Sequence, residues 1–151
     1  MSLPLIAHFE RDLRKLADEI SHFKSQENLW KVHPGITNSA GNLVLHLTGN
    51  LNYFIGTILG NTGYVRDRDR EFAAKDIAGR VLIEEVDALI PMVIKTLSGL
   101  SEADLQKEFP APIGGKPAST ESTLIHLYGH FNYHLGQINY LRRILEAGLS
   151  S

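Results

Sequence analysis

The sequence predicts an all-α protein built as a four-helix bundle. Apolar residues recur every three or four positions in four segments of similar length, which is the spacing of a buried stripe along a helix. No segment shows the sustained alternation of apolar and polar residues that a half-buried strand needs. Amphipathic helices of this kind bury their stripes against one another. At 151 residues the chain fits one domain, residues 1–151, whose core is large enough to need no disulfide.

The first two helices are delimited by residues that start or stop regular structure. The stripe of the first consists of Ile6, Phe9, Leu13, Leu16, Ile20 and Phe23. It ends before Pro34 and Gly35, which interrupt a helix. The segment 37–39, which reads TNS, offers N-cap side chains for the second helix. The stripe of that helix consists of Val44, Leu47, Leu51, Phe54 and Ile58, and it precedes a GNTG break.

Two connections and two helices follow. The charged run YVRDRDREFAAKD is interpreted as a solvated connection. The third stripe consists of Leu82, Val86, Leu89, Val93 and Leu97, and Pro91 within it predicts a kink. A polar loop is expected over 98–119, and its portion APIGGKPAST is expected to be mobile because glycine, proline and small residues dominate it. The fourth helix begins in the caps at 119–123, and its stripe consists of Leu127, Phe131, Ile138, Leu141 and Leu145.

Charge and cysteine content limit the possible functions. The 15 basic and 17 acidic residues give a net charge of −2, so we expect no nucleic-acid partner. The chain has no cysteine, so histidine, carboxylate or water must bind any metal. We see neither a leader peptide nor a run of about 20 apolar residues, and therefore expect a cytoplasmic protein that does not interact with a membrane.

The stretch HLYGHFNYHLGQI, at 126–138, places three of the seven histidines at intervals of four. Each such step turns about 40° around a helix, which puts His130 and His134 at the buried edge and His126 about 80° from His134. The i, i+4 spacing lets two imidazoles converge on one ion. Two hydrogen-bonded histidines in a packed interface are the alternative. We expect His126 to neighbour such a site without coordinating the metal.

A third histidine would favour the metal site. Among the other four, only His46 lies in mid-helix beside polar residues, on a ridge with Asn50, Tyr53 and Thr57. It projects about 100° from the centre of its stripe, so periodicity leaves its role open. His33 precedes the second helix and could reach the mouth of a cavity, although a surface position is the simpler interpretation.

Two stretches resemble a known family. NSAGNLVLHLTGNLNYF, at 38–54, and HLYGHFNYHLGQI are similar to the DinB superfamily of small metal-binding four-helix bundles, which includes YfiT-like proteins and bacillithiol transferases. The resemblance runs from LWKVHPG through the final helix, and H-x-x-x-H-x-G-Q is its most specific element. It implies a mirror variant of the up-and-down topology. It also implies a divalent ion, most often zinc or nickel, bound by His46, His130 and His134 with open positions for water.

The resemblance implies a chemistry as well. Three neutral imidazoles leave the ion its positive charge, so it could lower the pKa of a thiol or of water. Some relatives join a low-molecular-weight thiol such as bacillithiol to an electrophilic small molecule, and such thiol transfer is the leading hypothesis. A metal-dependent hydrolase and a non-catalytic metal or small-ligand binding protein are the alternatives. No catalytic residue is assigned.

Several other side chains are candidates for contacts to a substrate or to the metal ligands. They are Asn50, Tyr53, His126, Tyr133, Gln137 and His33. Asn50, Tyr53, Tyr133 and Gln137 could equally be ordinary polar residues of a bundle. Many members of the resembled family form homodimers, and we expect one here. Its surface would include Leu45, Tyr133 and Tyr140, which project away from the predicted core stripes.

Overall fold

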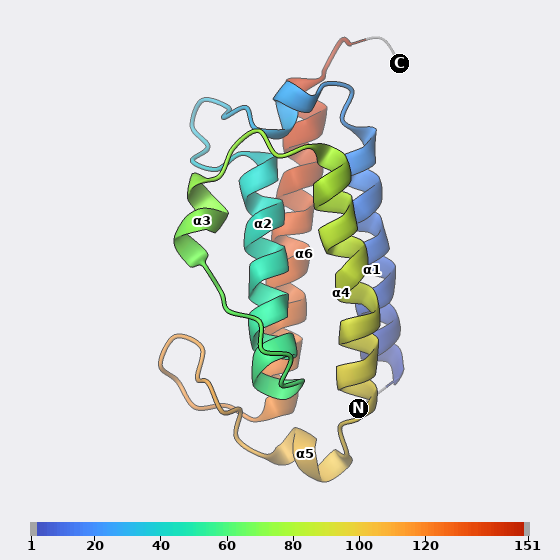
Figure 1. The fold of residues 1–151 in the computed structure, drawn as a ribbon, viewed down its shortest axis with the longest axis vertical. Coiled ribbons are helices and arrows are strands. Elements are labelled where there is room, and N and C mark those ends of the chain that lie inside the picture. Colours follow the sequence, from blue (N-terminus) through green and yellow to red (C-terminus); the bar gives the residue numbers. More distant parts are fainter. Residues whose placement is uncertain (1–2, 150–151) are drawn as a thin grey trace.

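The computed structural model describes residues 3–149 and shows four long helices side by side (Figure 1). They are α1 (Leu3–His22), α2 (Ala40–Leu51), α4 (Gly79–Ser98) and α6 (Thr120–Leu145). α1 packs against α4 and α6, and α2 packs against the same two helices, so α1 and α2 occupy opposite corners of the bundle. The predicted all-α four-helix bundle is confirmed, and the described residues contain no sheet.

Short elements connect the long helices. They are a 3-10 turn, η1 (Gln26–Leu29), a π-helix, η2 (Asn52–Leu59), and two short α-helices, α3 (Arg68–Ala73) and α5 (Glu102–Gln106). α5 lies within the segment expected to be a loop, because Ser101 and Asp104 form a capping box that starts a helical turn. Two isolated bridges, Glu108 to Ser119 and Ile113 to Lys116, pair the two sides of the following loop. α4 continues across Pro91 without interruption.

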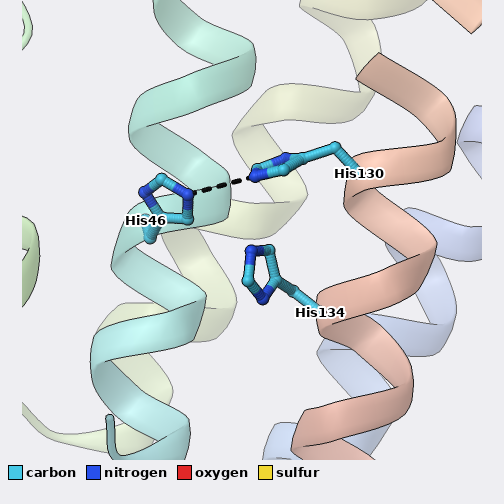
Figure 2. A group of neighbouring side chains, drawn as sticks. All are labelled: His46, His130 and His134. Carbon is cyan, nitrogen blue, oxygen red and sulfur yellow. Dashed lines mark hydrogen bonds between the residues drawn. The ribbon is translucent and has the colours of Figure 1, made fainter. Parts of the chain in front are cut away.

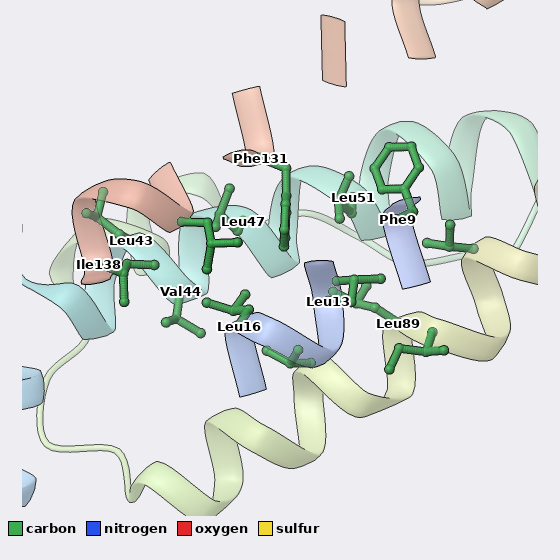
Figure 3. Packing of buried hydrophobic residues seen from close by; sticks show 14 of the residues in the cluster. Phe9, Leu13, Leu16, Leu43, Val44, Leu47, Leu51, Leu89, Phe131 and Ile138 are labelled. Carbon is green, nitrogen blue, oxygen red and sulfur yellow. The ribbon is translucent and has the colours of Figure 1, made fainter. Parts of the chain in front are cut away.

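One apolar core runs along the bundle axis and draws side chains from all four long helices (Figure 3). The predicted stripes of the first, third and fourth helices supply most of it: Phe9, Leu89 and Phe131, for example, are almost completely buried. Phe23 and Leu145, the last residues of their stripes, are only partly buried. Figure 3 shows Phe131 among the side chains of this cluster. Since Phe131 directly follows His130 in the sequence, packing of this ring also fixes the rotation of α6 about its axis.

The second stripe is shifted by one residue in its last two turns. Phe54 and Ile58 were expected in the core but are only partly buried, whereas Ile55 is fully buried. The cause is the π-helix that continues α2, because its i to i+5 hydrogen bonds widen each turn and change the spacing of the buried positions. The prediction is therefore right up to Leu51 and wrong beyond it.

The charged run between α2 and α4 does more than connect them. Within residues 68–73, residues 68–70 are exposed, as a solvated connection predicts, but that interpretation is wrong for Glu71, which is buried, and for Phe72, which is half-buried. This segment forms α3, which packs against α2 on the outside of the bundle (Figure 1). With α3, α4 and α6 around it, every residue of α2 is buried. Leu45, expected on an exposed surface, is only 2% exposed. Tyr133 and Tyr140 are exposed, as predicted, at 66% and 64%.

A buried carboxylate joins α1 to α6. Asp12 is fully buried and accepts hydrogen bonds from the Tyr128 hydroxyl at 2.5 Å, the Asn132 amide at 3.2 Å and the Arg11 guanidinium at 2.8 Å. Burial raises the pKa of Asp12, but these hydrogen bonds outweigh burial and hold the pKa below its ordinary value. Tyr128 and Asn132 flank His130 in the sequence, so this contact also helps to orient the histidine face of α6.

Within residues 3–149, no helix combines the length and the hydropathy that a membrane span requires.

Candidate metal centre

Three histidines that are distant in the sequence meet between α2 and α6 (Figure 2). His46 projects from α2, and His130 and His134 project toward it from successive turns of α6. One nitrogen of each ring lies within 4.8 Å of the other two. The Nε2 atoms of His46 and His130 are 3.2 Å apart. The structure thus brings together the three residues that the sequence analysis named as metal ligands.

A carboxylate from α3 fixes the orientation of the His46 ring. Nδ1 of His46 lies 3.0 Å from Oε1 of Glu71, a residue that is only 3% exposed. Because a carboxylate can only accept a hydrogen bond, Nδ1 carries the proton and donates it. Nε2 then keeps its lone pair and faces His130. This carboxylate–histidine arrangement is the one that commonly orients a metal-binding imidazole.

Glu71 is itself held in place from two sides. Arg66 donates to both carboxylate oxygens, each at 2.9 Å. Asn42 on α2 donates its side-chain amide to the backbone carbonyls of Glu71 and Ala74, at 3.0 and 2.8 Å, and so ties α3 to α2. The close approach of the Glu71 side chain to α2 also requires glycine at position 49, because a Cβ atom on Gly49 would lie 2.6 Å from Cδ of Glu71.

The two histidines of α6 differ in their surroundings. Nδ1 of His134 donates to Oε1 of Gln137 at 2.7 Å, which leaves Nε2 of His134 with a free lone pair. Nδ1 of His130 is buried without a hydrogen-bond partner in the described structure, and so is Oδ1 of Asn50. Nδ1 of His134 thus has a side-chain partner, whereas Nδ1 of His130 has none.

Burial favours the neutral, metal-binding form of two of these rings. Burial lowers the pKa of His46, and the hydrogen bond to Glu71 only partly opposes this effect. Burial, with the charges of the neighbouring His134 and His46, lowers the pKa of His130 to about 4. At neutral pH His46 and His130 are therefore uncharged, and each ring keeps one nitrogen lone pair with which it could bind a metal.

The donor set fits a divalent transition-metal ion. A tetrahedral zinc site with Zn–N distances of about 2.05 Å places two ligand nitrogens about 3.3 Å apart. The separation of 3.2 Å between Nε2 of His46 and Nε2 of His130 agrees with this value. Nitrogen ligands without carboxylate suit zinc, nickel, copper or iron better than magnesium or calcium. The cluster could therefore hold one such ion through His46, His130 and His134.

A cavity of about 510 Å³ opens beside the histidine cluster. It lies between the segment 35–38 and the face of α6 that carries Tyr133, Gln137 and Tyr140. His134 forms part of its wall, so the cavity borders one ring of the cluster. The ring of Tyr133 packs against that of His134, with centroids 5.2 Å apart. A molecule in this cavity would contact the ring of a candidate ligand directly.

Comparison with known proteins agrees with this architecture. The model of a family described as "Protein of unknown function (DUF1572)" matches residues 4–149. The chain belongs to this family. No curated protein matches it in sequence.

Two similar solved structures are DinB-like proteins from Bacillus. The one from Bacillus cereus ATCC 10987 aligns with a TM-score of 0.69 and 15% identity, over 92% of this chain and 89% of that one. YjoA from Bacillus subtilis aligns with the same TM-score and identity, over 98% and 94% of the two chains. The DinB-like fold that the sequence resemblance implied is therefore confirmed. At this level of identity, the likeness shows the fold alone.

The other candidate residues lie at different distances from the cluster. Gln137 and Tyr133 contact His134, as described above. Asn50 is buried one turn beyond His46 on α2. Tyr53 packs its ring against Phe54, with centroids 4.9 Å apart.

Two further histidines lie outside the cluster. His126 is exposed and lines a separate small cavity beside the loop at 113–118. His33 donates from Nδ1 to the carbonyl of Pro34 at 2.9 Å and is not part of the wall of the large cavity. Neither belongs to the three-histidine group.

Sequence reasoning missed the residues that orient His46. Glu71 and Arg66 belong to the charged run, where a solvated role was the simplest interpretation. The one available signal is local: Asp67 caps α3 by accepting from the backbone N–H of Arg70, and Phe72 provides an apolar residue for packing. The Phe72 ring lies 5.0 Å from that of His46. This signal predicts a short helix but does not show where that helix packs.

Proposed function

We propose that this protein is a metal-dependent enzyme of the DinB-like type, in which His46, His130 and His134 hold one divalent ion, zinc or nickel. The observation that carries the proposal is the convergence of three imidazoles, with partners on Nδ1 of His46 and of His134 that turn Nε2 toward the cluster. Such an ion would supply Lewis acidity and would lower the pKa of a thiol or water molecule at an open coordination position.

The surrounding residues would prepare the site for this chemistry. Glu71 and Arg66 keep His46 in one tautomer and one rotamer, so that little reorganisation accompanies ligand binding. The apolar ring of Phe72 covers one side of His46 and helps to exclude water. Gln137 performs for His134 the task that Glu71 performs for His46. The cavity beside His134 would hold a substrate next to one of the three proposed ligands.

Within this class, we propose transfer of a low-molecular-weight thiol to an electrophilic small molecule. The chain contains no cysteine, so a sulfur nucleophile must arrive as a cosubstrate. In such a transfer the thiol releases its proton to solvent, and its sulfur forms a bond to the electrophilic carbon. The leaving group departs with the electron pair of the broken bond.

The test is an assay of metal-loaded protein with bacillithiol, glutathione or cysteine against a panel of electrophiles. We expect turnover to require both the metal and the thiol, and to be lost in His134→Ala. His126→Ala is the matched control on the same helix and should remain active. Turnover without thiol would identify a hydrolase, and turnover without metal would refute both. A protein that binds metal but shows no turnover in either panel would be a binding protein.

A further inference from the structure

Exposed apolar side chains gather at one place on the surface. Among the residues whose burial is described, 4–149, eight large hydrophobic side chains are exposed. Four of these eight line the cavity beside the histidine cluster: Ile36, Tyr133, Tyr140 and Ile144. Leu43 and Leu141 complete its apolar wall. Single exposed hydrophobic residues are ordinary, but their concentration in one concave surface marks a binding site.

The polar part of the wall carries no charge. As the structure describes the cavity, the polar side chains that line it are Thr37, Asn38, Gln137 and His134, with the hydroxyls of the two tyrosines, and no lysine, arginine, aspartate or glutamate is among them. Arg66, which lies near His46, is already paired with Glu71. Arg143 lies over the Tyr140 ring, 5.3 Å from its centroid, but does not itself line the cavity. An anionic group held against this wall would therefore gain no counter-ion in direct contact, which disfavours its binding.

The cavity borders the candidate metal centre. His134 belongs to both, and Gln137, which orients His134, also lines the cavity. Its volume of about 510 Å³ lies within the usual range for sites that bind small molecules, about 300–1,000 Å³. A ligand could thus place one end at the histidines and the rest of its body against the apolar wall.

We propose that this cavity binds the uncharged, apolar or aromatic body of a small molecule whose single polar head reaches the metal centre. This inference rests on the proposed function and names the substrate class of the same site. In thiol transfer, the cavity would accept the electrophile. A multiply charged thiol would have to approach from elsewhere, because no cation lines this wall.

A second copy of the chain is the competing occupant, since exposed tyrosines also mark protein interfaces. The concave shape argues against it. In a two-fold interface a surface patch contacts the same patch on the second copy, and two concave surfaces of the same shape do not fill each other. The continuity with His134 also favours a ligand that has a metal-binding end.

The experiment measures the affinity of metal-loaded protein for three hydroxamates, whose common head binds metal ions. Acetohydroxamate carries only a methyl group on this head. 4-Phenylbutanohydroxamate carries a neutral aromatic body, and its 4-carboxyphenyl analogue carries the same body with a negative charge. We expect the neutral body to raise affinity at least about tenfold over acetohydroxamate, and the carboxylate to abolish that gain. Ile144→Ser should reduce the gain without changing metal content or acetohydroxamate affinity. Ile125→Ser is the matched control, because Ile125 is also exposed on α6 but lies outside the cavity.

Each other result has a defined meaning. Equal affinity for the three probes, or a preference for the charged body, would overturn the inference. Sedimentation showing a dimer that Ile144→Ser dissociates, with no gain from the aromatic body, would assign the cavity to a second copy instead. If the protein binds no metal, 4-phenylbutanamide tests the cavity alone. Retained binding would then support the cavity and refute the metal centre, and loss of binding would refute both.

Discussion

Replacement of Gly49 by alanine tests whether Glu71 positions His46. The Cβ atom of alanine would lie 2.6 Å from Cδ of Glu71, which is closer than any stable contact. The backbone of α2 is packed on all sides, so the side chain of Glu71 has to move. Once the carboxylate swings away, it loses its contacts with His46 at 3.0 Å and with Arg66 at 2.9 Å.

The expected magnitudes follow from two opposing effects on stability. Alanine in the middle of a helix is favoured over glycine by about 1 kcal/mol. A buried ion pair that loses one partner costs about 3 kcal/mol at the lower end of measured values, and Glu71 and Arg66 are both largely buried. We therefore expect Gly49→Ala to lower the free energy of unfolding by about 2 kcal/mol. Loss of the group that orients a metal ligand typically weakens metal affinity about 10- to 100-fold.

The assay combines urea denaturation of the metal-free protein with competition against a chromophoric chelator for zinc. Gly129→Ala is the control, because Gly129 also lies within a long helix but a Cβ there would meet nothing within 4 Å. It should stabilise the fold and leave zinc affinity unchanged. Glu71→Gln should weaken zinc binding without any steric change. If Gly49→Ala behaves like Gly129→Ala in both measurements, the positioning role of Glu71 is wrong.

Two further predictions concern metal content and pH. Elemental analysis should find that His46→Ala and His134→Ala lose bound metal while His126→Ala keeps it, and the ligand assignment fails if this order is reversed. Asp12→Asn should lower the free energy of unfolding at pH 7 by about 1 to 3 kcal/mol, because the Tyr128 hydroxyl and its neighbours lose a charged acceptor. Since the folded-state pKa of Asp12 is depressed, its stabilisation is complete above the unfolded-state value of about 3.9 and disappears as the pH falls toward the folded-state value. Denaturation curves of the two proteins should therefore converge in acid, and a constant difference would contradict this assignment.

The fold could be predicted from sequence wherever a helix packs through one regular stripe. Phe9 on α1, Leu89 on α4 and Phe131 on α6 lie in the core because three-four spacing places them there. The prediction failed in α2 for two physical reasons. The π-helix moves burial from Phe54 to Ile55, and the packing of α3 buries Leu45 on a side that a four-helix bundle would leave exposed.

The metal centre shows the same division between local and distant determinants. The partner of His134 is Gln137, three residues later on the same helix, so helical spacing alone brings the two side chains together. The partner of His46 is Glu71, which lies on a different helix. Glu71 reaches His46 because α3 packs against α2, where Gly49 leaves room for the Glu71 carboxylate. No periodicity within α2 or within the charged run predicts that α3 packs against α2. A bundle pattern would assign the side of α2 that faces α3 to solvent. Glu71 and Phe72 cover that side, and their contacts with His46 complete the site.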